Sequence, residues 1–124
     1  MSAGLAMSEQ QLYDVVVGSD ANPGLARIYH WRVAHFRAAM TNQGWRTPVA
    51  ADGKGFPDLI MIRGDDLLAI ELKTDVGYVT TAQRLWLDAF APIALLAAVW
   101  RPAQWADGTI LRTLSGSGET RIEQ

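Results

Sequence analysis

The chain has 124 residues, of which 49% are hydrophobic, and a net charge of −2. Its length and hydrophobic content suit one domain with a single packed core. It has no cysteine, so disulfides, thiolate metal sites and cysteine nucleophiles are excluded. The longest apolar stretch, residues 89–100, is too short to span a bilayer, and the N-terminus lacks the basic and apolar parts of a signal peptide, so a cytoplasmic protein is expected.

The N-terminal part of the chain is predicted to be helical with one break. Residues 8–17 are predicted to form a short helix with apolar residues at three- and four-residue spacing, and Ser8 can cap it. Residues 18–24 are rich in Gly, Asp, Asn and Pro and are predicted to form a loop. Residues 25–29 could restart a helix, whereas the pattern of residues 31–36 fits a helix or a strand.

Residues 37–55 are polar with scattered small residues and are predicted to form a long loop, which in a compact domain is usually functional or mobile. Residues 25–56 carry five basic residues and one acid, a net charge of +4, so the rest of the chain carries −6. Such a segment can hold a phosphate backbone, because each Lys or Arg contact with phosphate releases counterions. The alternative is a solvated basic face without a partner.

A β-hairpin is predicted around the turn sequence Arg63–Asp66, because an apolar run stands on each side of it. Counting outwards from the middle of the turn pairs Asp58 with Glu71. Directly opposed residues have Cβ atoms about 4.5–5.5 Å apart on one face of the sheet. Lys73 shares this face, because side chains alternate along a strand.

This arrangement of charges predicts a metal site. Two opposed carboxylates in a largely apolar hairpin repel each other, and a hard divalent cation would compensate for the repulsion. Mg²⁺ typically takes one or two carboxylates plus substrate phosphate, and Lys73 would add a second positive charge. These are the components of a metal-dependent phosphodiesterase. The alternative is an ordinary surface hairpin with a Glu–Lys pair.

The last third of the chain is predicted to alternate between helix and strand. Thr80 and Gln83 form a capping box that opens an amphipathic helix, which Pro92 ends. Residues 95–100 are predicted to form a buried strand, and residues 104–114 a last helix, weakened by a glycine.

This order of elements predicts an α/β fold with a small central mixed sheet flanked by helices. Residues 8–114 are expected to form one domain, with flexible termini at residues 1–7 and 115–124.

The motifs resemble those of the PD-(D/E)xK nuclease superfamily and, within it, the small phage and actinobacterial members of the VRR-NUC family. The resemblance is carried by Gly55–Leu59, then Glu71–Lys73, then Gln83 in the following helix, and it extends over about residues 8–114. It implies a restriction-endonuclease-like core for the sheet and its helices.

The resemblance also implies roles for the site residues. Asp58 and Glu71 would bind Mg²⁺ or Mn²⁺, and Lys73 would orient or help to deprotonate the attacking water. A carboxylate on the first helix usually completes such a site. By position this is Glu9, with Asp14 as the alternative, because the loop after this helix is an insertion relative to the family.

Gln83 has two interpretations, as a helix cap and as a catalytic residue near the metal, and both can hold. The candidate DNA-binding residues are His35, Arg37, Arg46 and Lys54. The expected activity is Mg²⁺-dependent endonucleolytic cleavage of DNA, with junction or flap DNA as candidate substrates. The expected partners are DNA and, as often in the family, a second copy of the chain, without an organic cofactor. The alternative is a non-catalytic DNA-binding or accessory module of a phage, restriction or repair system.

Overall fold

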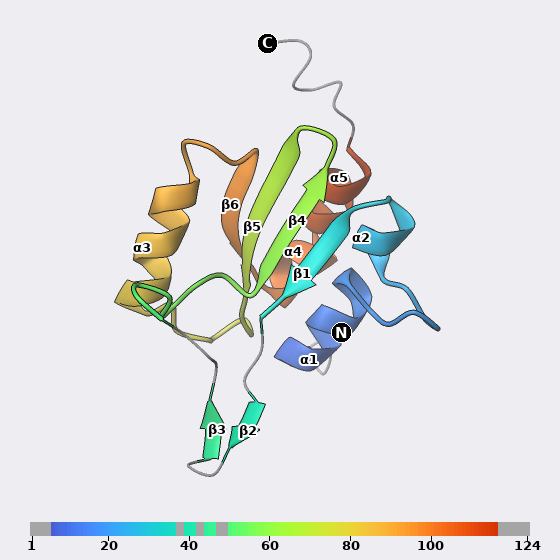
Figure 1. Cartoon of the computed structure of the whole chain (residues 1–124). Coiled ribbons are helices and arrows are strands. Elements are labelled where there is room, and N and C mark those ends of the chain that lie inside the picture. The colour runs from blue at the N-terminus through green and yellow to red at the C-terminus, as the bar shows by residue number, and fades with distance from the viewer. Residues whose placement is uncertain (1–5, 37–38, 42–43, 47–49, 117–124) are drawn as a thin grey trace.

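The computed structural model describes residues 6–36, 39–41, 44–46 and 50–116 (Figure 1). The helices of this part are α1 (Glu9–Val16), α2 (Leu25–Ile28), α3 (Thr81–Phe90), α4 (Pro102–Ala106) and α5 (Thr109–Ser115). The strands are β1 (Arg32–His35), β2 (Ala39–Thr41), β3 (Gly44–Arg46), β4 (Leu59–Arg63), β5 (Asp66–Leu72) and β6 (Leu96–Trp100). In this described part, none of the helices has the length and apolar character needed to cross a membrane.

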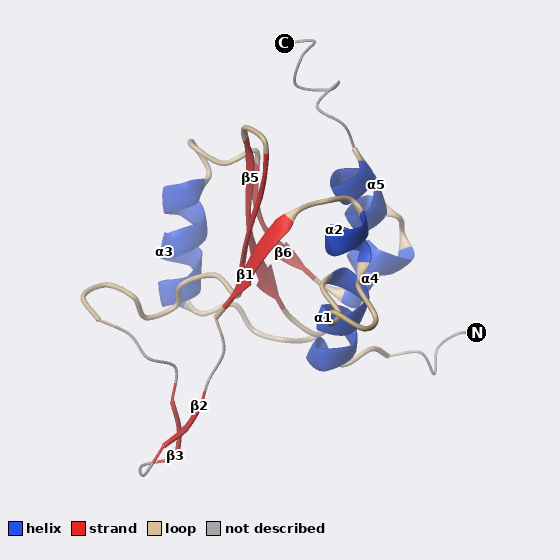
Figure 2. Cartoon of the chain, turned by 45° about the vertical axis from the view of Figure 1, so that its right-hand side comes forward, coloured by secondary structure: helices blue, strands red, loops and turns tan. Residues whose placement is uncertain are grey.

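A four-stranded mixed sheet in the order β1-β4-β5-β6 forms the centre of the fold. β4 is antiparallel to both β1 and β5, whereas β6 runs parallel to β5. Figure 2 shows α3 on one side of this sheet and α1, α2, α4 and α5 on the other. The predicted α/β architecture, a small mixed sheet flanked by helices, is therefore confirmed.

The hydrophobic core lies between the sheet and the four helices on its larger side. Alternate residues of the two central strands point into it, and they pack against α1, α5 and the end of β6. The fully buried members of this core include Leu12, Val16, Leu59, Met61, Leu68, Ile70, Trp100, Ile110 and Leu114. Because neighbouring residues on a strand face opposite ways, Ala69 and Glu71 of β5 point toward the α3 side.

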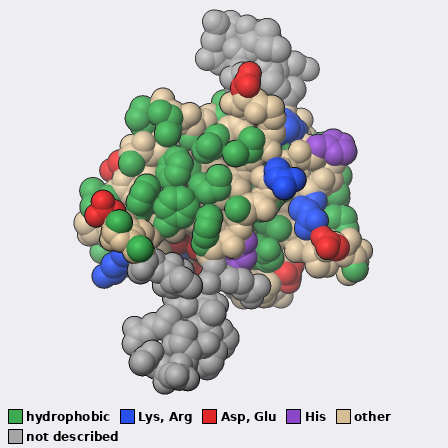
Figure 3. Space-filling model, viewed as in Figure 1, with side chains coloured by type: hydrophobic (Ala, Val, Ile, Leu, Met, Phe, Trp, Pro, Cys, Tyr) green, Lys and Arg blue, Asp and Glu red, His purple; other side chains and the backbone are tan. Residues whose placement is uncertain are grey.

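The α3 side of the sheet is covered unevenly. α3 packs mainly on β5 and β6. Toward β1 and β4, apolar side chains reach the surface, where Phe36 and Ile62 are each 46% exposed. Figure 3 shows apolar side chains gathered on this face of the molecule.

The structure assigns the secondary structure of two segments that the sequence left open or predicted incorrectly. The segment that fitted a helix or a strand forms β1, paired with β4. The prediction of one long loop over residues 37–55 is wrong in part, because β2 and β3 form a short antiparallel hairpin there. Each of these strands has only three residues, too few to show a period of two in the sequence.

The prediction of one helix over residues 104–114 is also wrong. The segment contains two helices, because Gly108 has a φ of +86° and interrupts the first after Ala106. α4 begins earlier than predicted, at Pro102, whose ring favours the first position of a helix. The predicted capping box of Thr80 and Gln83 is confirmed at the start of α3.

Gly55 fits the loop before Asp58 closely against α3. Its φ is +83°, and a Cβ at this position would lie 2.6 Å from the carbonyl carbon of Ala82. Gly64, in the turn between β4 and β5, has a φ of +60° but no atom within 4 Å of such a Cβ. Gly55 is therefore required both by backbone conformation and by space, whereas Gly64 is required by conformation alone.

We expect Gly55→Ala to lower the free energy of unfolding more than Gly64→Ala does. Both variants place Ala in the left-handed region, at about 1–2 kcal/mol each. Only Gly55→Ala adds a clash, at about 1–3 kcal/mol more. Urea unfolding followed by tryptophan fluorescence measures both variants. Equal decreases in the two variants would contradict the close approach of this loop to α3.

Candidate active site

The two acids of the hairpin lie opposite each other, as predicted. Leu59 pairs with Ile70 and Ile60 with Ala69, so the next position outwards sets Asp58 against Glu71. Asp58 Oδ2 accepts a hydrogen bond of 2.9 Å from the backbone N–H of Leu72. This bond holds the Asp58 carboxylate at the end of β5.

Glu71 is an acid buried in the α3 side of the sheet, with only 3% of its surface exposed. Its Oε2 accepts a hydrogen bond of 2.9 Å from Gln83 Nε2 and lies 3.7 Å from Lys73 Nζ. Its Oε1 is buried and has no hydrogen-bond partner among the described residues. Among the described residues, one oxygen of Glu71 is thus hydrogen-bonded and the other has no donor.

Burial raises the pKa of the Glu71 carboxyl to about 8, and the negative charge of Asp58 adds to the rise. The positive charge of Lys73 acts in the opposite direction but does not balance these effects. At neutral pH the two acids therefore need a proton or a cation between them.

The Asp58–Glu71 pair fits a hard divalent cation. Both residues supply carboxylate oxygens, the ligands that Mg²⁺ prefers, and Glu71 Oε1 is a buried oxygen that lacks a partner among the described residues. The raised pKa of Glu71, caused first by burial and then by the charge of Asp58, shows that its ionised form is unfavourable here without a further positive charge.

Glu9 lies near this pair but does not complete a three-carboxylate group. It stands in the first turn of α1, where partial burial and then the negative charge of Asp58 raise the pKa of its carboxyl, and Lys73 lowers it. Glu9 therefore lies close enough to Asp58 and Lys73 for their charges to act on it. However, no three His, Asp or Glu side chains of the described residues lie close enough together to hold a metal ion.

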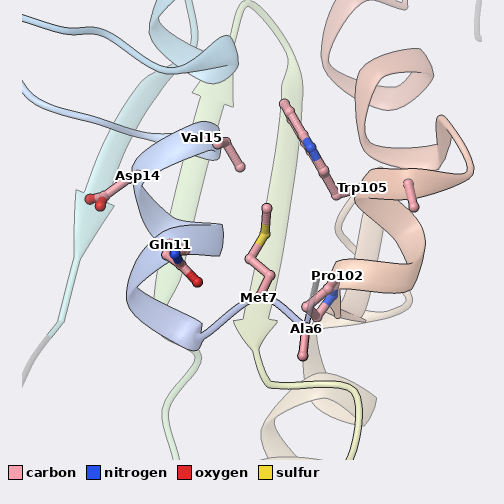
Figure 4. Close-up of a pocket in the computed structure, with 8 residues that line it drawn as sticks. Ala6, Met7, Gln11, Asp14, Val15, Pro102 and Trp105 are labelled. Atoms are coloured by element: carbon pink, nitrogen blue, oxygen red, sulfur yellow. The ribbon is translucent and has the colours of Figure 1, made fainter. Parts of the chain in front are cut away.

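The alternative acid, Asp14, belongs to a different part of α1. Its Oδ1 accepts a hydrogen bond of 2.9 Å from Gln10 Nε2. It borders a pocket between α1 and α4 with a volume of about 600 Å³, which Met7 and Trp105 also line (Figure 4). Asp58 acts electrostatically on Glu9, so Glu9 stays the α1 candidate for the site.

Gln83 serves as both a helix cap and a site residue. Its Oε1 accepts a hydrogen bond of 2.9 Å from the backbone N–H of Thr80, which closes the capping box. Its Nε2 donates to Glu71. The interpretation as a helix cap is confirmed, and the other end of the amide contacts Glu71, whereas the catalytic role stays a prediction. The N-terminus of α3 is thereby tied to the buried acid.

An aromatic cluster, which the sequence did not reveal, holds the loop that carries Asp58. The Phe56 ring lies 4.9 Å from the Trp86 ring and 5.1 Å from the Phe36 ring, measured between centroids, in edge-to-face arrangements. Phe90 lies 5.8 Å from Phe56. The only sequence signal was that Phe56 directly precedes Pro57 and Asp58. Packing between these rings connects β1, the loop and α3 around the site.

The structure places only some of the candidate DNA-binding residues. His35 stands at the end of β1, with its ring 4.3 Å from that of Tyr13 in α1. Lys54 is exposed in the loop before Asp58. Arg37 and the side chain of Arg46 lie outside the described residues, so their grouping with Lys54 stays a prediction.

Comparisons of the chain with family models, with curated proteins and with solved structures give no match. The resemblance to the PD-(D/E)xK superfamily therefore rests on the motifs of this chain alone.

Proposed function

We propose that this protein is a DNA endonuclease that hydrolyses phosphodiester bonds with Mg²⁺ or Mn²⁺ as its cofactor. The observation that carries the proposal is the opposed pair Asp58 and Glu71, one of them deeply buried, beside Lys73. A buried acid with an oxygen that has no donor among the described residues is costly to the fold. A bound cation would compensate for the buried negative charge, whereas an ordinary surface hairpin offers no reason to bury the acid.

In this mechanism Asp58 and Glu71 would hold the cation. When bound, a divalent cation lowers the pKa of a water ligand and offsets the charge of the phosphate. Gln83 keeps the Glu71 carboxylate in position through its hydrogen bond. Lys73, whose side chain is 14% exposed, would orient the attacking water or help to deprotonate it, and would face the scissile phosphate. Glu9 is the candidate for a further carboxylate contact.

The test is a cleavage assay with labelled linear duplex, flap and four-way-junction DNA, each with Mg²⁺, Mn²⁺ or EDTA. Cleavage with either metal, and none with EDTA, is the expected result. The alternative function is a non-catalytic DNA-binding or accessory module. It would be supported by binding of the same DNA without cleavage under any of the three conditions. The homodimer that the family resemblance implies is part of the proposal, and light scattering would measure it as twice the mass of one chain.

We expect Arg37, Arg46 and Lys54 to bind phosphates of the DNA backbone. Replacing all three by Gln should weaken binding. It should also reduce the slope of the logarithm of the binding constant against the logarithm of the salt concentration by about one for each phosphate that is no longer neutralised. Fluorescence anisotropy over a series of salt concentrations measures the slope.

Arg27→Gln is the matched control, because Arg27 is already paired with Asp20 at 2.6 Å. It should leave the slope unchanged. An unchanged slope in the triple variant would contradict phosphate binding and support the alternative, in which the basic segment is a solvated face without a partner.

A further inference from the structure

The segment from Thr74 to Val79 joins two residues of the site. It leaves the sheet directly after Lys73 and enters the capping box at Thr80, from which Gln83 reaches Glu71. Gly77, in its middle, lies against Lys73: a Cβ on Gly77 would be 3.3 Å from both Cβ and Cδ of Lys73. This segment is therefore one wall of the candidate active site.

Several hydrogen bonds hold the segment in one conformation. Arg101 Nη1 donates to the carbonyl oxygens of Thr74, at 2.7 Å, and Gly77, at 2.9 Å. The Gly77 N–H donates to the Thr74 carbonyl at 3.2 Å, and Asp75 Oδ1 accepts from the N–H of Ala103 at 3.0 Å. A loop tied in this way to the end of β6 and the start of α4 can present its side chains in defined positions.

Two apolar side chains of this rigid segment point into solvent. Val76 is 93% exposed and Tyr78 is 77% exposed, one on each side of Gly77. Neither side chain contributes to the core. Binding residues are often carried on loops that a rigid scaffold holds in place. The neighbouring residues are proposed to act on a phosphodiester of DNA. The apolar groups that DNA presents close to such a phosphodiester are its bases.

We propose that Val76 and Tyr78 form a base-contacting surface, with the Tyr78 ring stacked on an unpaired base next to the scissile phosphate. This inference rests on the proposed function. A stack of an aromatic ring on a base is sequence-tolerant and contributes about 1–3 kcal/mol per base. An unpaired base offers its face at lower cost than a base in continuous duplex, because no stacking between bases has to be broken. Val76, two residues earlier on the same segment, would add an apolar contact to the bases.

The experiment measures binding and cleavage separately. The probe is a duplex with a short single-stranded gap that contains 2-aminopurine, a fluorescent adenine analogue quenched by stacking, and the reference is the same duplex without the gap. Binding is measured in EDTA and cleavage in Mg²⁺. Tyr78→Ala should abolish the quenching and weaken gap binding on the order of tenfold, within the range expected for one base stack. Tyr78→Phe, which keeps the ring, should behave as wild type.

Ile93→Ala is the matched control, because Ile93 is 75% exposed but lies beyond the other end of α3. It should leave binding and cleavage unchanged. Wild-type quenching, binding and cleavage in Tyr78→Ala would overturn the inference and leave the proposed nuclease function standing. Quenching that needs Tyr78 but comes without cleavage in Mg²⁺ would support the surface and overturn the nuclease. A wild-type protein that binds neither DNA would overturn both.

Discussion

Asp58→Asn and Glu71→Gln should each lower DNA cleavage on the order of 10³-fold, because the several kcal/mol that a bound cation contributes to the transition state are removed and each 1.4 kcal/mol is a factor of ten. Both changes keep the shape of the side chain and remove its charge. The two acids lie opposite each other on the hairpin, and Glu71 is almost fully buried. Each variant should therefore also lose most of its affinity for Mn²⁺ in a calorimetric titration.

Lys73→Met is the comparison that separates metal binding from turnover. The Lys73 ammonium lies 3.7 Å from Glu71 Oε2, but a positive group is no ligand for a cation. Cleavage should fall in this variant while Mn²⁺ binding persists. If Asp58→Asn or Glu71→Gln cleaves DNA at a rate near that of the wild type, the assignment of the site is wrong. Loss of metal binding in Lys73→Met with cleavage retained would reverse the role of the lysine.

The metal-free protein should lose stability as the pH rises from about 4.5 to about 8. Burial and the charge of Asp58 raise the pKa of Glu71 from 4.5 to about 8 in the folded state. Over this window the folded protein binds more protons than the unfolded chain, so the free energy of unfolding falls as the pH rises. Below the window Glu71 is protonated in both states and the effect vanishes. Each pKa unit corresponds to about 1.4 kcal/mol, so the decrease can reach a few kcal/mol.

Urea unfolding in EDTA at pH 5 and pH 8 measures this effect. Glu71→Gln should flatten the profile, because the amide cannot ionise. Glu9→Gln is the matched comparison: the pKa of Glu9 is raised in the same direction, but Glu9 is much less buried than Glu71, so its removal should change the profile less. Mg²⁺ should restore stability at pH 8, since a ligand that binds only the folded state stabilises it. A profile of the wild type as flat as that of Glu71→Gln would contradict the buried, charge-deficient site.

Several features followed from the sequence because their causes are local. The register of the β4–β5 hairpin follows from the turn at Gly64 and Asp65 together with the period of two in the strands. The starts of α1 and α3 follow from Ser8 and Thr80, whose side chains accept hydrogen bonds from backbone groups three residues ahead. In each case the interacting groups are few residues apart, so the pattern of residue types carries the information.

The contacts of Arg63 could not be predicted from local sequence. In the sequence Arg63 is a residue of the predicted turn. In the structure its Nη1 donates to the carbonyl oxygens of Tyr29, at 3.1 Å, and Leu114, at 3.0 Å, and its guanidinium lies 4.4 Å from the Trp31 ring. These partners come from segments far apart in the chain, and no local pattern pairs them.

The facing of Asp58 and Glu71 could be predicted from the sequence, because the register of a hairpin depends on neighbouring residues. The ionisation of Glu71 could not be predicted, because it depends on packing between distant segments. The pKa of Glu71 depends first on its burial under α3, and its carboxylate is held by the amide of Gln83 from the same helix. The rigid segment after Lys73 likewise depends on Arg101, which comes from beyond β6. Burial and long-range hydrogen bonds are properties of the packed chain, and they arise only when segments distant in sequence meet.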